Sequence, residues 1–246
     1  MDHSHSAISV NLNKCIHCKL CVQACHDIQG NNVIGMEGRG NSSNIVFDMN
    51  DPMGWSSCVA CGECVQVCPT NALSTSNEEA YKLEPTLNET VNSVCPYCGV
   101  GCQLEVHVKE NKILKVEGRD GPANHGRLCV KGRFGLDYVS HPDRLTTPLI
   151  RKANRPKNAE YQADERGVIN DFRKASWEEA LDFAAEGFRK IFGQFGSSAL
   201  AGFGSAKGSN EEAYLFQKLV RTGFGTNNVD HCTRLCHASS VAALME

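Results

Sequence analysis

Twelve of the fourteen cysteines in this chain fall into three sets of four. Two sets have the spacing C-x2-C-x2-C-x3-C, and the third has C-x2-C-x3-C followed, after 26 intervening residues, by its last cysteine. Four thiolates at such spacings can hold an iron-sulfur cubane, so the pattern predicts centres that carry electrons. The sets are Cys15, Cys18, Cys21 and Cys25; Cys58, Cys61, Cys64 and Cys68; and Cys95, Cys98, Cys102 and Cys129.

The first two sets match the signature of bacterial two-cluster ferredoxins, in which the fourth cysteine ligates the other cluster. Three closely spaced cysteines lie on one loop around a cube, whereas the fourth lies where the chain leaves that loop. We therefore expect one [4Fe-4S] cluster on Cys15, Cys18, Cys21 and Cys68, and another on Cys58, Cys61, Cys64 and Cys25. Pro69 completes the second motif, but His26 replaces proline in the first, so we expect the turn after Cys25 to differ while Cys25 remains a ligand.

Two other interpretations of the cysteines are less favoured. A secreted disulfide framework would call for a leader, and Met1 to Asn11 has neither an apolar core nor a twin-arginine pair. Zinc also takes four cysteines, but usually as paired C-x2-C knuckles. Clustered cysteines without a leader indicate metal in a reducing compartment, so we expect a cytoplasmic protein.

The third set has a more specific resemblance. Val94-Cys95-Pro96-Tyr97-Cys98-Gly99-Val100-Gly101-Cys102, together with Leu128-Cys129-Val130-Lys131-Gly132-Arg133-Phe134-Gly135, resembles the opening cluster domain of the molybdopterin oxidoreductase family. The resemblance implies a third [4Fe-4S] cluster beside a molybdenum or tungsten bis-molybdopterin guanine dinucleotide cofactor. It also implies that Lys131 bridges cluster and pterin, the alternative being an ordinary surface lysine.

The two remaining cysteines lie in a segment, Asn228 to Val241, that resembles the metal-binding segment of formate dehydrogenases. The resemblance implies that Cys236 binds molybdenum or tungsten and that His237 assists proton transfer. A soft thiolate suits such a metal, and an imidazole can accept a proton near neutral pH. Without the resemblance, these residues with His231 and Cys232 could be a zinc site, or the two cysteines could be packing residues; we expect Cys232 to be structural.

The elements that must position these residues begin with an internal repeat. Cys21-Val22-Gln23-Ala24-Cys25 recurs as Cys64-Val65-Gln66-Val67-Cys68, so two similar units hold the first two sets. The region between them is rich in Gly and Asn, with one short strand expected over Asn44 to Phe47. Such a region buries little apolar surface, so bound metal should supply much of its stability.

The rest of the chain shows alternating and helical patterns. Leu104 to Val108 and Ile113 to Val116 predict a hairpin that returns the chain towards Cys129. Ser176-Trp177-Glu178-Glu179 is a capping box at the start of an amphipathic helix. A short strand over Ser198 to Phe203 and a helix from Glu211 to Arg221 then indicate an α/β domain.

These patterns predict an α+β fold in four parts. A two-cluster ferredoxin-type domain covers residues 1–75, a polar linker 76–92, a small β-rich [4Fe-4S] domain 93–148, and the beginning of an α/β molybdopterin-binding domain 149–246. The apolar helical start over Ser239 to Glu246 has nothing to pack on, so we expect the chain to be a truncated piece of a larger protein.

Composition excludes two classes of partner. The formal net charge of −3 supplies no basic field for nucleic acid. No apolar run approaches the ~18 residues that would suggest a membrane span.

The order of domains is similar to that of the alpha subunit of cytoplasmic, NAD-linked formate dehydrogenases. This resemblance implies oxidation of formate to carbon dioxide, with electrons passing through Lys131 and three clusters to a flavin- and iron-sulfur-containing partner subunit that reduces NAD. Residues 1–246 alone should bind clusters but not turn over formate. The alternatives are a nitrate reductase of the same family and a non-catalytic subunit resembling the large iron-sulfur subunit of complex I.

Overall fold

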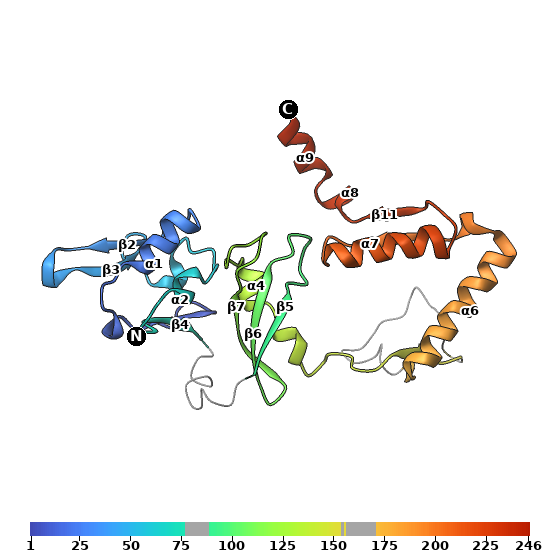
Figure 1. Cartoon of the computed structure of the whole chain (residues 1–246), viewed down its shortest axis with the longest axis horizontal. Helices are drawn as coiled ribbons and strands as arrows, with labels where there is room; N and C mark the ends of the chain where they lie inside the picture. The colour runs from blue at the N-terminus through green and yellow to red at the C-terminus, as the bar shows by residue number, and fades with distance from the viewer. Residues whose placement is uncertain (77–88, 154, 156–170) are drawn as a thin grey trace. The chain divides into compact units, whose positions relative to one another are not determined.

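The computed structural model describes residues 1–76, 89–153, 155 and 171–246 (Figure 1). It divides into two compact units, Met1–His141 with Ala206–Asn210, and Pro142–Ser205 with Glu211–Glu246. Short helices and small sheets occur in both, so the α+β class is confirmed. Most of the predicted linker, 77–88, lies outside the described residues, and the predicted domain boundaries stay predictions.

The first part of the chain is built from very short elements. Strand β1 (Ile8–Val10) pairs antiparallel with β4 (Leu73–Thr75), and β2 (Ile34–Glu37) pairs antiparallel with β3 (Asn44–Phe47). The strand expected over Asn44 to Phe47 is therefore confirmed. The helices are α1 (Leu20–Gln23) and α2 (Glu63–Gln66), with a π-helical turn over Ala24–Ile28 and 3-10 turns over Leu12–Lys14, Gly40–Ser42 and Met53–Trp55.

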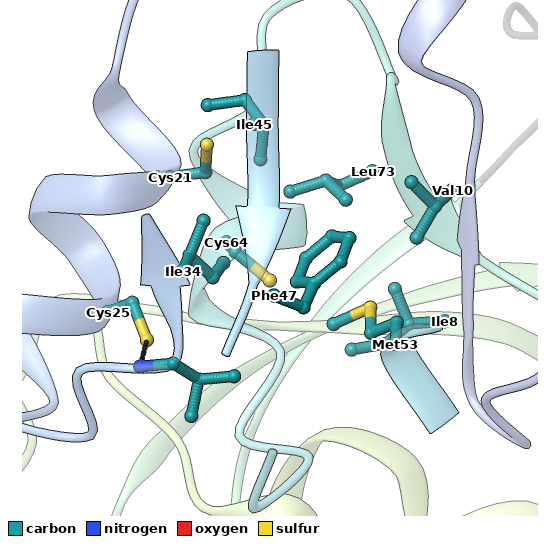
Figure 2. Packing of buried hydrophobic residues seen from close by; sticks show 11 residues of the cluster. Ile8, Val10, Cys21, Cys25, Ile34, Ile45, Phe47, Met53, Cys64 and Leu73 are labelled. Carbon is teal, nitrogen blue, oxygen red and sulfur yellow. Dashed lines mark hydrogen bonds between the residues drawn. The ribbon is translucent and has the colours of Figure 1, made fainter. Parts of the chain in front are cut away.

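The core of this part mixes apolar side chains with cysteines from the predicted ligand sets. Figure 2 shows Cys21, Cys25 and Cys64 among Ile34, Ile45 and Phe47. Three of the eleven buried core residues are therefore cysteines rather than aliphatic or aromatic side chains. The full set is Ile8, Val10, Cys21, Cys25, Val33, Ile34, Ile45, Phe47, Met53, Cys64 and Leu73.

A three-stranded antiparallel sheet follows, in the order β5 (Glu89–Val94), β6 (Gln103–Lys109) and β7 (Lys112–Gly118). The predicted hairpin is confirmed, and its two turn residues, Glu110 and Asn111, have φ of 49° and 61°. Residues 89–92, which the sequence analysis places in the linker, form the first part of β5. The β5 sequence, Glu-Thr-Val-Asn-Ser-Val, has no apolar–polar alternation that would predict a strand, and all six residues are exposed.

After the sheet, α4 (Val130–Phe134) begins directly after Cys129 and contacts β7 (Figure 1). A 3-10 turn covers Asp137–Ser140. The core under this sheet includes Cys95, so another predicted ligand is also a packing residue. Its buried members are Cys95, Leu104, Val106, Val116, Leu128 and Leu136.

Among its described residues, the second unit contains longer helices and two pairs of strands. The capping box is confirmed, because the Glu179 N–H donates to the Ser176 hydroxyl over 3.1 Å at the start of the longest helix. The predicted strand lies later than expected, at Gly202–Gly204, where it pairs parallel with Val229–His231. The elements are β8 (Leu149–Arg151), β9 (Phe172–Lys174), α6 (Trp177–Phe195), a 3-10 turn (Ser197–Ala199), β10 (Gly202–Gly204), α7 (Asn210–Lys218), a π-helical turn (Leu219–Gly223), β11 (Val229–His231), α8 (Thr233–Cys236) and α9 (Ala238–Met245).

Across the parts of the chain that the structure describes, every helix is too short or too polar to cross a lipid bilayer.

Candidate metal centres

The two copies of the repeat share one backbone conformation. In the first loop His17 and Lys19 have φ of 56° and 64°, and in the second loop Ala60 and Gly62 have φ of 55° and 73°. These residues follow equivalent cysteines, so each loop turns through the left-handed region twice before its helix begins. Three of the four carry a side chain in a conformation that usually favours glycine. The shared shape indicates that both loops wrap around similar objects.

Four cysteines from opposite ends of the repeat line one cavity. Cys15, Cys18 and Cys21 come from the first loop, and Cys68 comes from the second copy. The cavity has a volume of about 380 Å³, including the space at its open mouth. The His17 backbone N–H donates to Cys15 Sγ over 3.4 Å. This is the crossed grouping expected from the spacing; ligation of a cluster by these cysteines stays a prediction.

The complementary four cysteines line a second cavity, of about 320 Å³ including its open mouth. Cys58, Cys61 and Cys64 come from the second loop, and Cys25 comes from the first copy. Backbone N–H groups again reach the sulfurs. Val33 donates to Cys25 Sγ over 3.3 Å (dashed line in Figure 2), and Ala60 donates to Cys58 Sγ over 3.4 Å.

The donor sets of both cavities fit an iron-sulfur cubane. Four thiols face each space, and N–H groups donate to sulfurs in both, which is one way in which proteins adjust cluster potentials. Within the described residues, no three His, Cys, Asp or Glu side chains converge on a single metal ion. A cubane does not require such convergence, because each of its four thiolates binds a different iron atom.

Without metal, the buried thiols hold their protons. Burial raises the pKa of Cys21 to about 11, and it raises the pKa of Cys64 well above its usual value. Burial also acts to raise the pKa of Cys68, but hydrogen bonds from the backbone of Leu73 and Thr70 outweigh it and lower that pKa. Because a cluster binds thiolates, loading it must release these protons, and the bound iron must supply the free energy for that release.

The turn after Cys25 differs from the turn after Cys68. Cys25 and the exposed His26 lie within the π-helical turn Ala24–Ile28, so the chain stays coiled after the cysteine. Proline lacks the N–H that a helical turn uses, and Pro69 follows Cys68 outside any helix. The substitution changes this turn, while Cys25 still lines the second cavity.

The third set is assembled by the ends of the three-stranded sheet. Cys95 and Cys102 lie on either side of the β5–β6 connection, and the Cys95 N–H donates to the Cys102 carbonyl over 2.9 Å. Burial raises the pKa of Cys95, and the neighbouring Cys129 and Cys98 thiols act in the same direction. The hairpin therefore brings the late cysteine back to the early ones, as expected.

Lys131 lies beside this set. It is exposed in the first turn of α4, two residues after Cys129, and its positive charge acts to lower the pKa of Cys95 against the effect of burial. An exposed cation within electrostatic reach of the cluster thiols suits the bridging role that the resemblance implies. That role stays a proposal, because the pterin is the group that it would contact.

Cys236 and His237 are neighbours at the end of α8. Both are exposed, and Cys236 Sγ lies 3.7 Å from His237 Nε2. Cys232 precedes the same helix, and its carbonyl accepts from the Cys236 N–H over 3.0 Å. A thiol beside an imidazole can bind a metal while a proton is held nearby, so these residues fit the roles implied for them.

Sequence reasoning missed one group that joins the first two sets to the third. Arg133 of α4 contacts Glu63 and Gln66 of α2. Arg133 and Glu63 are buried, and Gln66 is half-buried. None of them belongs to a ligand motif. The available signal was that Gly62 and Glu63 replace Lys19 and Leu20 between the copies of the repeat.

Anaerobic cluster assembly should protect twelve of the fourteen cysteines from alkylation by iodoacetamide. We expect about twelve iron and twelve sulfide per chain, with Cys232 and Cys236 as the two residues that still react, because both are exposed and lie outside the three sets. Peptide mass spectrometry of the alkylated chain, with iron and sulfide analysis, measures this. Stoichiometric zinc without sulfide, or protection of Cys232, would contradict the assignment.

Comparison with protein families identifies three matching segments. The 4Fe-4S dicluster domain matches residues 14–72, the Molybdopterin oxidoreductase Fe4S4 domain matches residues 88–141, and the Molybdopterin oxidoreductase domain matches residues 144–246. The first match contains the two crossed cavities. The second contains the sheet with the third set, and the third contains the segment with Cys236.

Similar proteins occur in Staphylococcus and Bacillus species. The chain is 34% identical over 271 residues to "Putative formate dehydrogenase SH0748" of Staphylococcus haemolyticus, and the aligned region covers 94% of the chain and 26% of that protein. It is 36% identical over 281 residues to "Probable oxidoreductase YjgC" of Bacillus subtilis, and the aligned region covers 99% of the chain and 27% of that protein. The chain thus spans about a quarter of the length of these curated relatives.

Proposed function

Because the chain belongs to the molybdopterin oxidoreductase family and carries its iron-sulfur domains, we propose that it is the N-terminal part of a formate dehydrogenase alpha subunit. The complete enzyme would oxidise formate to carbon dioxide, two electrons and one proton. The names of the relatives support formate as the substrate, as does the His237 imidazole beside the Cys236 thiol. That pair carries the proposal, since an electron carrier without molybdenum has no need of a metal-ligating Cys236.

The protein's own residues would have distinct tasks. Cys236 would hold molybdenum or tungsten, which accepts the electrons of formate when a bis-molybdopterin guanine dinucleotide binds it. His237 would hold the released proton at its ring, beside the Cys236 thiol. Lys131 would bind the pterin and keep it against the cluster of Cys95, Cys98, Cys102 and Cys129.

Electrons would then pass outward through the three clusters. The four cysteines around the second cavity lie in the domain that α4 contacts through Arg133, so their cluster would be the next carrier. The cluster of the first cavity would follow. A flavin- and iron-sulfur-containing subunit that reduces NAD in the cytoplasm is the partner that this scheme requires.

Formate should reduce the clusters of the complete, anaerobically purified enzyme, whereas nitrate should not oxidise the reduced clusters. Reduction appears as loss of the broad absorption of oxidised clusters and as the gain of an electron paramagnetic resonance (EPR) signal. Acetate is the control for formate and chloride is the control for nitrate, each at the same ionic strength. Rapid oxidation by nitrate would identify a nitrate reductase, and no response to either substrate would favour a subunit that only carries electrons.

A further inference from the structure

A buried arginine joins the third-set domain to the two-cluster domain within the first compact unit. Arg133 Nη2 donates to Glu63 Oε2 over 3.1 Å, and the side chains of Arg133 and Glu63 are 3% and 8% exposed. Arg133 Nε donates over 2.8 Å to the carbonyl of Cys61, a residue that lines the second cavity. The guanidinium therefore contacts the backbone of the predicted cluster loop itself.

The second loop is shaped to receive this side chain. A Cβ atom at Gly62 would lie 2.1 Å from Arg133 Cδ, so only glycine leaves room for the arginine there. The equivalent residue in the first loop is Lys19, which has the same left-handed backbone and is exposed. The two loops thus share a backbone but differ at the residue that faces Arg133.

Gln66 extends the same contact. Its Oε1 accepts from Arg133 Nη1 over 2.6 Å and from the Gly118 N–H over 3.1 Å. Its Nε2 donates to the Gly126 carbonyl over 3.2 Å. One side chain of the two-cluster domain therefore binds α4, the end of β7 and the loop after it, which orients the two domains at this contact.

The buried positive charge acts on the thiols of the second cavity. Burial lowers the pKa of Arg133, and attraction by Glu63, Cys61 and Cys64 opposes this lowering. An arginine stays protonated in such surroundings. Charges in a poorly solvated interior interact more strongly than charges in water, so this cation favours added negative charge on a cluster in that cavity.

We propose that Arg133 is a positioning residue that docks the two domains and raises the reduction potential of the cluster held by Cys25, Cys58, Cys61 and Cys64. Glu63 is its counter-charge and limits the rise. The proposal rests on the proposed cluster ligation, not on formate as the substrate. Net charge near a cluster is one of the factors that set its potential.

EPR-monitored redox titration of the 246-residue chain with assembled clusters tests this. Arg133→Met removes the cation and should lower one midpoint potential, and Glu63→Gln removes the counter-charge and should raise the same one. We expect the ratio of reduced to oxidised cluster at fixed ambient potential to change about tenfold in each case, about 59 mV for a one-electron couple. Iron and sulfide should equal those of the wild type, which separates a shifted cluster from a missing one.

Two further variants control for charge and for structure. Arg39→Met removes the same charge from an exposed residue of the β2–β3 connection and should shift no potential. Arg133→Lys keeps the charge but loses the forked contact. The ratio of reduced to oxidised cluster should therefore stay within about twofold of the wild-type ratio, while hydrogen exchange in α2 and α4 should become faster.

The outcomes separate an electrostatic role from a purely structural one. A shift of the same sign in Arg133→Met and Glu63→Gln, or no shift in either, would overturn the proposal. If Arg133→Met assembles no second-cavity cluster, Arg133→Lys decides: a wild-type potential supports the role of the charge, and a lowered potential or a missing cluster rejects it. Iron and sulfide already absent from the wild type would instead refute the proposed ligation.

Discussion

Replacing Cys236 with serine in the complete enzyme should abolish formate oxidation and leave the EPR signals of the clusters unchanged. A hydroxyl oxygen is a harder and weaker ligand than a thiolate for the metal that we propose at this residue. We expect the rate of formate-dependent dye reduction to fall at least about a hundredfold, since loss of a single oxyanion-hole donor already costs other enzymes about a hundred- to a thousandfold. Within residues 1–246 the Cys236 side chain belongs to neither buried core, so the substitution should leave the fold of this part unchanged.

Cys232 supplies the matched control for this experiment. It lies four residues earlier beside the same helix and is also exposed, so Cys232→Ser makes the same chemical change outside the proposed ligand. We expect it to keep wild-type turnover. His237→Gln should lie between the two, since a proton can still leave through water. Full turnover by Cys236→Ser would exclude this residue as the metal ligand.

Local patterns predicted the parts of the cluster region that depend on local chemistry. The cysteine spacing predicted the crossed sets, and the structure gathers the same two groups of four around separate cavities. Alternation predicted the β6–β7 hairpin, and the capping box predicted the start of α6. The residues that determine the hairpin and the helix start lie within a few positions of one another, and the crossed sets follow from a motif that both copies of the repeat contain.

Elements that depend on distant partners could not be predicted in the same way. Strand β5 is exposed throughout and is defined by its pairing with β6, which no pattern in Glu89–Val94 records. The strand expected over Ser198 to Phe203 forms at Gly202–Gly204, because its partner Val229–His231 pairs there. The Arg133–Glu63 contact joins residues 70 positions apart and follows from packing between domains.

The repeat illustrates how one motif acquires two roles. Both loops turn through the left-handed region at equivalent residues, so either could wrap a cluster. Only the second has Gly62 and Glu63, and only this combination admits the Arg133 side chain and neutralises its charge. The first loop has Lys19 and Leu20 there, both exposed. The two loops of the two-cluster domain are therefore not equivalent, because the second loop is the one that contacts Arg133 of the third-set domain.

Removing the clusters should unfold the two-cluster domain. Its strands have three or four residues, its α-helices have four, and each of its sheets has only two strands. Two-stranded sheets and single helical turns are marginal in water without further packing. Three of its eleven buried core residues are cysteines that the clusters would hold in place. Cluster binding should therefore supply much of the free energy of folding, as metal binding does in other small metal-dependent domains.

Hydrogen exchange before and after iron chelation measures this dependence. Amides of β1, β2, β3 and β4 should exchange slowly with clusters bound and approach the rate of an unfolded chain after chelation. Helix α6 is the internal control, because none of the three cysteine sets lies in the second unit. Ile8→Ala separates packing from ligation: this core side chain is 0% exposed and lines neither cysteine cavity, so the substitution should cost about 2–5 kcal/mol of stability without loss of iron. Slow exchange that persists after chelation would mean that apolar packing alone holds the domain together.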